Sequence, residues 1–148
     1  MNNKNLSMGN ATNWPDEVVI HTDGASRGNP GDASLGLTVL DAEGETLFEY
    51  AEALGTQTNN YAEYSAVLKA LELASENHVK LLHLRSDSQL LIRQLTGEYK
   101  VKSEGLKPLF LACRDVARTI PKVNFEHVRR EQNARADKLA NMVLDEIF

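Results

Sequence analysis

The amino-acid sequence predicts an α/β fold: a mixed five-stranded sheet in the order 3-2-1-4-5, with helices on both faces. Segments with the composition of strands alternate with segments of helical periodicity. They follow one another as three strands, a helix, a strand, two helices, a strand and a final helix. Because parallel strands are joined through helical crossovers, this order places the first, fourth and fifth strands side by side and parallel at the centre of the sheet.

Short apolar runs mark the strands. The first run is β-branched, which is typical of a strand buried on both faces, and it leads into a turn-rich segment that begins at Asp23. An Asp-Ala-Glu-Gly turn at 41–44 separates the second and third runs, as in a hairpin. The predicted strands are residues 18–22, 35–40, 46–54, 81–85 and 123–128.

Capping residues and apolar periodicity mark the helices. Thr58, Asn59 and Asn60 offer N-cap chemistry, and the helix after them carries an apolar stripe at spacings of three and four. Gly97 ends the second helix, and Pro121 lies just beyond the third. The first predicted helix follows residues 58–60 and ends near residue 77, and the other predicted helices are residues 90–95, 106–119 and 133–147.

The length and composition suit one globular domain. Of 148 residues, 42% are hydrophobic and 25% charged. Residues 1–16 are rich in Asn and poor in apolar side chains, so we predict a flexible lead-in there and a folded domain over 17–148. No apolar run approaches the ~18 residues of a membrane span. The single Cys113 cannot form an internal disulfide, so we expect a buried thiol and a cytoplasmic protein.

Four carboxylates lie where the predicted fold would bring them together. Asp23 and Asp87 end neighbouring parallel strands, so both emerge at the same edge of the sheet. Glu63 lies on the apolar stripe of its helix, and Asp137 borders the stripe of the last helix. Singly, the aspartates could be turn residues or a helix-dipole partner. A buried, unpaired Glu63 would be costly, which favours a shared function.

Clustered carboxylates repel one another unless a cation neutralises them. All-oxygen ligation favours Mg²⁺ or Mn²⁺, whereas the four histidines show no spacing that suits zinc. Two such ions can promote in-line phosphoryl displacement. The net charge of −5 argues against nucleic acid as a partner on average, but a local basic patch can coexist with an acidic site.

Four blocks of the sequence resemble, in order, the motifs of type 1 ribonucleases H. They lie at residues 22–31, 58–63, 86–89 and 133–140. The resemblance implies a ribonuclease H-like fold and two Mg²⁺ or Mn²⁺ ions. It also implies endonucleolytic hydrolysis of the RNA strand of RNA–DNA hybrids, leaving 5′-phosphate and 3′-hydroxyl ends. The implied catalytic metal ligands are Asp23, Glu63, Asp87 and Asp137.

The same resemblance implies a set of substrate contacts. They are Gly24, Ser26, Asn29, Thr58, Asn59, Asn60 and Gln89. A glycine lets backbones approach closely, and Asn and Gln can reach minor-groove edges and 2′-hydroxyls. Thr58 and Asn29 resemble the family's pocket for a phosphate of the DNA strand. For Asn59 and Asn60, helix capping alone is the alternative.

Two departures from the family pattern concern the catalytic loop and the basic handle. The loop at 128–132 is short and lacks the mobile-loop histidine, which resembles the archaeal-type branch with an arginine instead. We therefore assign to Arg130 a role in product or leaving-group release, with a phosphate contact as the alternative. His127 should be partly buried within the last strand. The handle is reduced to a stub at 100–105.

Without a handle, only a modest basic rim is expected to contact the hybrid. The candidate cations are Arg27, Lys100, Lys102, Lys107, Arg129, Arg130 and Arg135. We expect a monomer that binds its substrate weakly and in a salt-sensitive manner.

Two other functions are open at this stage. One is another nuclease of the same architecture, such as a 3′–5′ exonuclease or a resolvase, and the other is a non-catalytic hybrid-binding module. Asn59, Asn60 and Gln89 suit hybrid grooves, which disfavours the first. The presence of all four acids disfavours the second.

Overall fold

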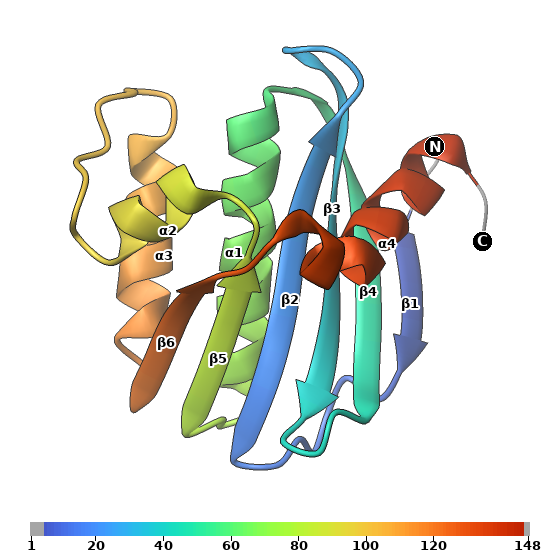
Figure 1. The fold of residues 1–148 in the computed structure, drawn as a ribbon, viewed down its shortest axis with the longest axis vertical. Helices are drawn as coiled ribbons and strands as arrows, with labels where there is room; N and C mark the ends of the chain where they lie inside the picture. The colour runs from blue at the N-terminus through green and yellow to red at the C-terminus, as the bar shows by residue number, and fades with distance from the viewer. Residues whose placement is uncertain (1–4, 147–148) are drawn as a thin grey trace.

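The protein forms a six-stranded sheet flanked by helices (Figure 1). The structure is a computed structural model and describes residues 5–146. The strands are β1 (Asn5–Gly9), β2 (Glu17–Ser26), β3 (Gly31–Asp41), β4 (Thr46–Gln57), β5 (Leu81–Ser86) and β6 (Lys122–His127). The helices are α1 (Asn59–Glu76), α2 (Gln89–Leu95), α3 (Lys107–Ala117), α4 (Ala134–Asp145) and the 3-10 turn η1 (Arg130–Asn133). Within these described residues, no helix has the length and apolar character needed to cross a membrane.

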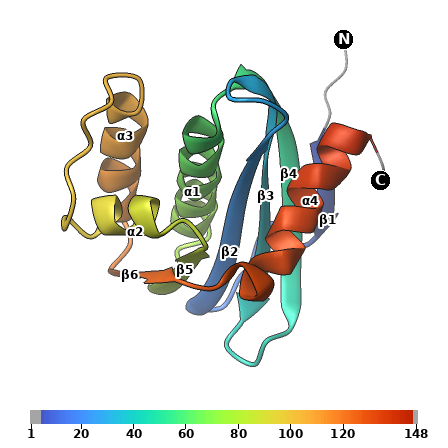
Figure 2. The same ribbon diagram turned by 45° about the horizontal axis from the view of Figure 1, so that its top comes forward.

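The strand order is β1-β4-β3-β2-β5-β6. Apart from β1, this is the predicted order, and β2, β5 and β6 are the predicted parallel neighbours. The remaining pairs are antiparallel. Helix α4 covers one face of the sheet, whereas α1 covers the other, with α3 packed beside it (Figure 2). The prediction of a mixed sheet with helices on both faces is therefore confirmed.

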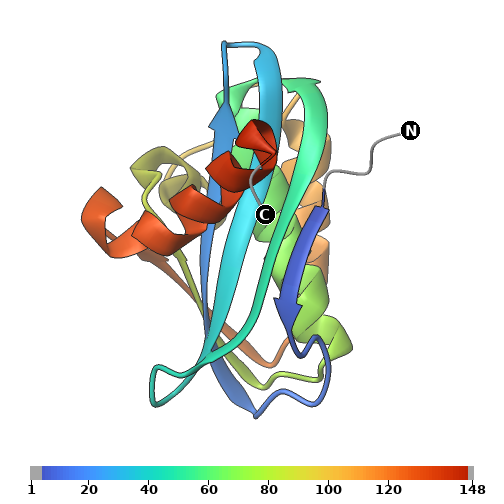
Figure 3. The ribbon, with the colours of Figure 1, turned by 90° about the vertical axis from the view of Figure 1, so that its right-hand side faces the viewer.

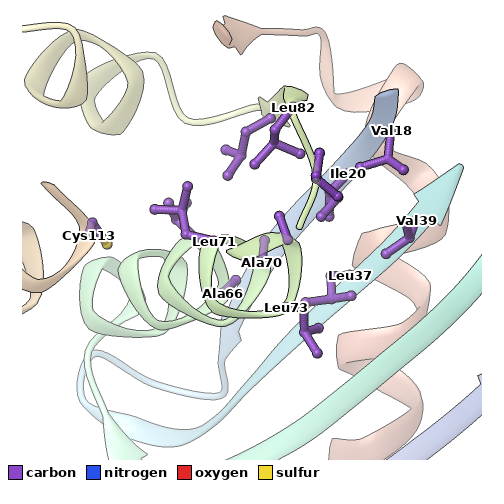
Figure 4. Close-up of a cluster of buried hydrophobic side chains, with 14 of the residues drawn as sticks. Val18, Ile20, Leu37, Val39, Ala66, Ala70, Leu71, Leu73, Leu82 and Cys113 are labelled. Atoms are coloured by element: carbon purple, nitrogen blue, oxygen red, sulfur yellow. The ribbon is translucent and has the colours of Figure 1, made fainter. Parts of the chain in front are cut away.

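The main core lies between the sheet and α1 (Figure 4). Val18 and Ile20 of β2 point toward the same layer as Leu37 of β3, and all three are fully buried. They meet the stripe of α1 that includes Ala66 and Ala70. Small residues on this stripe let the helix lie close to the strands, because the separation of packed elements depends on the size of the side chains between them.

The prediction of a flexible lead-in over residues 1–16 is wrong for the part that the structure describes. From Asn5 to Gly9 the chain is β1, paired antiparallel with β4 at the edge of the sheet (Figure 3). Trp14 is buried against Phe48, with ring centroids 6.1 Å apart. Edge pairing uses backbone groups, which an Asn-rich segment supplies as well as an apolar one, so composition alone missed it. Residues 1–4 lie outside the described residues.

Strand β2 is also longer than predicted. The turn-rich composition after Thr22 suggested that the strand ends at Asp23, but pairing with β3 continues from Gly24, opposite Leu35, to Ser26, opposite Ala33. Partner strands thus keep Asp23 in extended backbone, where local propensity favours a turn.

Candidate active site

The carboxyl ends of the parallel strands bring two acids to one edge of the sheet. The recorded parallel pairing of β2 with β5 ends at His21 opposite Arg85. Asp23 and Asp87 lie two residues beyond these partners, so the chain delivers both at the same level. In Figure 1 the arrowheads of β2, β5 and β6 point toward this edge. The arrangement matches the expectation for ligand sites in such sheets.

Helix α1 adds a third acid to this pair. Carboxylate oxygens of Asp23, Glu63 and Asp87 lie within 4.8 Å of one another. The Asn59 amide donates to Glu63 Oε1 at 2.7 Å, which orients that carboxylate. A Cβ on Gly24 would lie 2.3 Å from the backbone nitrogen of Glu63, so only glycine allows β2 to pass this close to α1.

Asp137 reaches the cluster from the other face of the sheet. It stands in the first turn of α4, the helix that packs on β2, β3 and β4. Its carboxyl lies close enough to Asp23 and Asp87 to raise the pKa of each. Asp137 does not belong to the group of three that lies within 4.8 Å. The structure therefore gathers all four predicted acids, with Asp137 near both Asp23 and Asp87.

Asn133 holds the start of α4 against β2. It is 1% exposed, its amide donates to the Thr22 carbonyl at 2.8 Å, and its Oδ1 lies 3.1 Å from His21 Nδ1. Sequence reasoning placed Asn133 in a motif but gave it no role, because its partners are more than a hundred residues away. These two contacts of Asn133 fix the start of α4, and with it the position of Asp137, relative to β2.

Burial and mutual repulsion raise the pKa values of the acids. Burial raises the pKa of Asp23 to about 8, with further contributions from Asp87, Asp137 and Glu63. Burial and the nearby Asp87 raise the pKa of Glu63 to about 7. Without a counter-charge the cluster is therefore not fully ionised at neutral pH. The donors are all carboxylate oxygens, which is the set that a hard divalent cation prefers.

Arg130 supplies a positive charge beside the acids. It lines an open cavity of about 370 Å³ together with Asp23, Gly24, Asn59, Glu63, Asp87 and Ser88. Burial raises the pKa of Asp87, whereas Arg130 and, more weakly, His127 lower it. The expectation that His127 is partly buried is wrong: it is exposed, because it is the last residue of an edge strand.

The predicted substrate residues surround this cavity on three elements. Ser26 and Asn29 lie at the β2–β3 turn, Thr58 to Asn60 begin α1, and Gln89 begins α2. Asn29 Oδ1 accepts from the backbone N–H of Asn59 at 3.1 Å, which ties the turn to α1. Asn29, the three residues at the start of α1 and Gln89 are exposed, so a ligand can reach them.

Comparisons with known proteins identify relatives that span most of this chain. The protein-family model described as reverse transcriptase-like matches residues 21–143. Ribonuclease HI of Halobacterium salinarum is 40% identical over 87% of this chain and 65% of that protein. A bifunctional protein of Mycobacterium tuberculosis is 38% identical over 87% of this chain, which spans only 36% of that protein.

Solved structures of ribonucleases H1 also superpose on this chain. The Halobacterium salinarum ribonuclease H1 superposes with a TM-score of 0.85 at 38% identity, covering 88% of this chain and 98% of that one. A ribonuclease H1 isolated from compost, solved in complex with an RNA/DNA hybrid, superposes with a TM-score of 0.83 at 40% identity, covering 87% and 97%. The chain therefore belongs to the type 1 ribonuclease H family.

Proposed function

We propose that the protein is an endonuclease that hydrolyses the RNA strand of RNA–DNA hybrids with two Mg²⁺ or Mn²⁺ ions, leaving 5′-phosphate and 3′-hydroxyl ends. One observation carries the proposal: three carboxylates converge within 4.8 Å in an open cavity of a chain from this family. The compost relative, at 40% identity, is solved in complex with an RNA/DNA hybrid.

The four acids are the residues that would hold the ions: Asp23, Glu63, Asp87 and Asp137. When bound, such ions promote in-line displacement at phosphorus. The protein contributes a rigid frame, since Asp23 stands on β2, Asp87 directly follows β5, and Glu63 is oriented by Asn59. Arg130 remains at the edge of the cavity, where its charge can assist departure of the leaving oxygen or release of product.

Polar groups beside the acids suit the two strands of a hybrid. Thr58 Oγ1 accepts from Tyr61 N–H, and Asn29 Oδ1 accepts from Asn59 N–H. Each side chain thereby keeps a donor for a phosphate oxygen of the DNA strand. The exposed Asn60 and Gln89 can reach 2′-hydroxyls of the RNA strand, which distinguish it from DNA.

The decisive experiment is cleavage of an end-labelled RNA–DNA hybrid with Mg²⁺, Mn²⁺ or EDTA. Single-stranded RNA, double-stranded RNA and double-stranded DNA serve as controls, and a hybrid with blocked ends tests for exonuclease action. We expect internal cuts in the RNA strand of the hybrid that require the metal. Absence of cleavage by folded protein would favour a hybrid-binding module, and cleavage that blocked ends abolish would favour an exonuclease.

Replacing Arg130 with Ala should lower kcat by about 10²-fold, the typical cost of removing one group that stabilises developing charge. KM for the hybrid should rise only slightly, by the share of one phosphate contact, and the melting temperature should change little, because Arg130 is exposed. Arg129→Ala is the matched control, since Arg129 is exposed but does not line the cavity. A raised KM with unchanged kcat would show that Arg130 only contacts a phosphate.

Binding of the hybrid should be salt-sensitive but depend on few cations. Carboxylates already pair with some cations of the predicted rim: Arg27, Lys107 and Arg135. Others are exposed and form no ion pair with any residue between 5 and 146: Lys100, Lys102, Arg129 and Arg130. With about four phosphate contacts, log K against log salt should have a slope of roughly −3 to −4.

Fluorescence titrations of a labelled hybrid at several salt concentrations measure this slope. Replacing Lys100 and Lys102 together with Ala should make it shallower by about two. Affinity that stays constant across the salt series would contradict the assignment of these cations to phosphates.

A further inference from the structure

Asn141 connects a metal-ligand candidate to a distant turn. It lies one helical turn after Asp137 on α4. Its Nδ2 donates to the Asp137 carbonyl at 2.9 Å and to Asp137 Oδ1 at 3.3 Å. Its Oδ1 accepts from Arg27 Nη2 at 2.9 Å, across a separation of 114 residues. Both ends of this amide are therefore engaged.

Arg27 determines which way the amide points. A guanidinium can only donate hydrogen bonds, so it must face the oxygen of Asn141 rather than the nitrogen. The amide N–H groups are thereby directed at Asp137. Without Arg27, either orientation of the amide would be available, and one of them would place an oxygen against the carboxylate.

A second contact secures Arg27 itself. Its Nη2 lies 2.9 Å from Asp145 Oδ1 near the end of α4, and its backbone N–H donates to the Asp32 carbonyl at 2.8 Å. The β2–β3 turn is thus attached to α4 at two positions, and one of these attachments continues to Asp137.

The same β2–β3 turn is also connected by hydrogen bonds to Glu63, the acid on α1. Asn29 Oδ1 accepts from Asn59 N–H, and the Asn59 amide donates to Glu63 Oε1 at 2.7 Å. One turn therefore supports acids that come from opposite faces of the sheet. On the α4 side the contact is made by Asn141, a residue that lies outside the four sequence motifs.

We propose that Asn141 is a positioning residue for Asp137, and that Arg27 fixes the orientation of its amide. A hydrogen bond to one carboxylate oxygen restricts rotation of the Asp137 side chain and leaves the other oxygen free for a ligand. Such supporting groups raise metal affinity because the ligand is already oriented before the ion arrives. The proposal rests on the proposed function, since it takes Asp137 to be a metal ligand.

The test compares Asn141→Ala with wild type in two assays. Calorimetric titration with MnCl₂, without nucleic acid, should show metal affinity about tenfold weaker, a cost typical of losing a group that supports a ligand. In the cleavage assay, the Mg²⁺ concentration for half-maximal rate should rise by about the same factor, whereas KM for the hybrid stays near the wild-type value.

Variants of the partner residues separate this role from a general structural one. Arg27→Ala should weaken metal binding in the same direction, and the double variant should be no worse than Asn141→Ala, because both changes break one path. Asp145→Asn keeps an Oδ1 that can accept from Arg27 and leaves the Arg27–Asn141 bond in place, so it should behave as wild type. Unchanged Mn²⁺ affinity in Asn141→Ala, with or without a lower melting temperature, would overturn the proposal.

The titration also separates the two proposals. If wild-type protein binds Mn²⁺ but cuts no hybrid, the proposed function fails, while the comparison of metal affinities still decides the role of Asn141. If wild-type protein does not bind Mn²⁺, both proposals fall together.

Discussion

Asp23→Asn should abolish cleavage of the hybrid while making the protein more stable. Asp87, Asp137 and Glu63 all raise the pKa of Asp23, which shares the cavity with Glu63 and Asp87, so Asp23 is central to the four acids. Losing its charge should reduce the rate by at least about 10³-fold, as expected when one member of a catalytic unit is removed. The hybrid should still bind, since the predicted substrate contacts are unchanged.

The gain in stability follows from the raised pKa of Asp23, which is about 8 in the folded protein. In the unfolded chain this pKa is about 3.9, so ionised Asp23 disfavours the folded state. The stability of wild-type protein without metal should therefore fall as the pH rises from about 4 to about 8. The neutral amide escapes this loss, so the advantage of Asp23→Asn should grow across the same interval.

Thermal unfolding in EDTA at several pH values measures the effect. The difference between the folded and unfolded pKa values of Asp23 sets an upper bound of about 5 kcal/mol at pH 8. Because the neighbouring acids share protons with Asp23, we expect a smaller gain of about 1–2 kcal/mol, or roughly 2–8 °C in melting temperature for a chain of this length. Asp115→Asn is the control, because Asp115 is exposed on α3 and its pairs with Arg114 and Arg118 are at the surface. Retained Mg²⁺-dependent cleavage by Asp23→Asn would refute the catalytic assignment.

Gly24→Ala should destabilise the fold and inactivate the site together. The new Cβ would lie 2.3 Å from the Glu63 nitrogen and 2.4 Å from the Ala62 carbonyl carbon. Both are backbone atoms of α1, so no side-chain rotation can relieve the clash. Moving the helix would cost at least about 2 kcal/mol, at the upper end of ordinary overpacking, and would displace Glu63 from the other acids.

Denaturant unfolding and cleavage assays on the same preparation test both parts of this prediction. Gly36→Ala offers a parallel case on the other face, where a Cβ would lie 2.4 Å from the Ala136 carbonyl oxygen of α4. Gly105→Ala is the control, since its nearest neighbour would be Ser103 Oγ at 3.8 Å. Wild-type stability and activity in Gly24→Ala would contradict the close approach of β2 and α1.

Patterns within single elements were readable from the sequence. The apolar stripe of α1 identified the face that carries Glu63, and the β-branched run that begins at Val18 identified a central strand. The order of elements then determined which strands are parallel, and hence that Asp23 and Asp87 share an edge. These inferences succeed because burial and hydrogen bonding impose a regular period on each element.

Features that depend on partners far along the chain were not readable in this way. The edge pairing of β1 depends on the backbone of β4. The exposure of His127 follows from its place at the end of an edge strand. Asn141 is bonded to Arg27, which lies 114 residues away in the sequence.

By itself, the sequence determined the fold class, the family and the identity of the four candidate acids, because these depend on local patterns and on motifs in a particular order. Only the tertiary structure decided how the acids meet: three lie within 4.8 Å, and Asp137 lies near Asp23 and Asp87 and is supported by Asn141. The physical reason is that hydrogen bonds and burial act between atoms that are close in space. Which atoms become close is settled only when β2, α1 and α4 pack together.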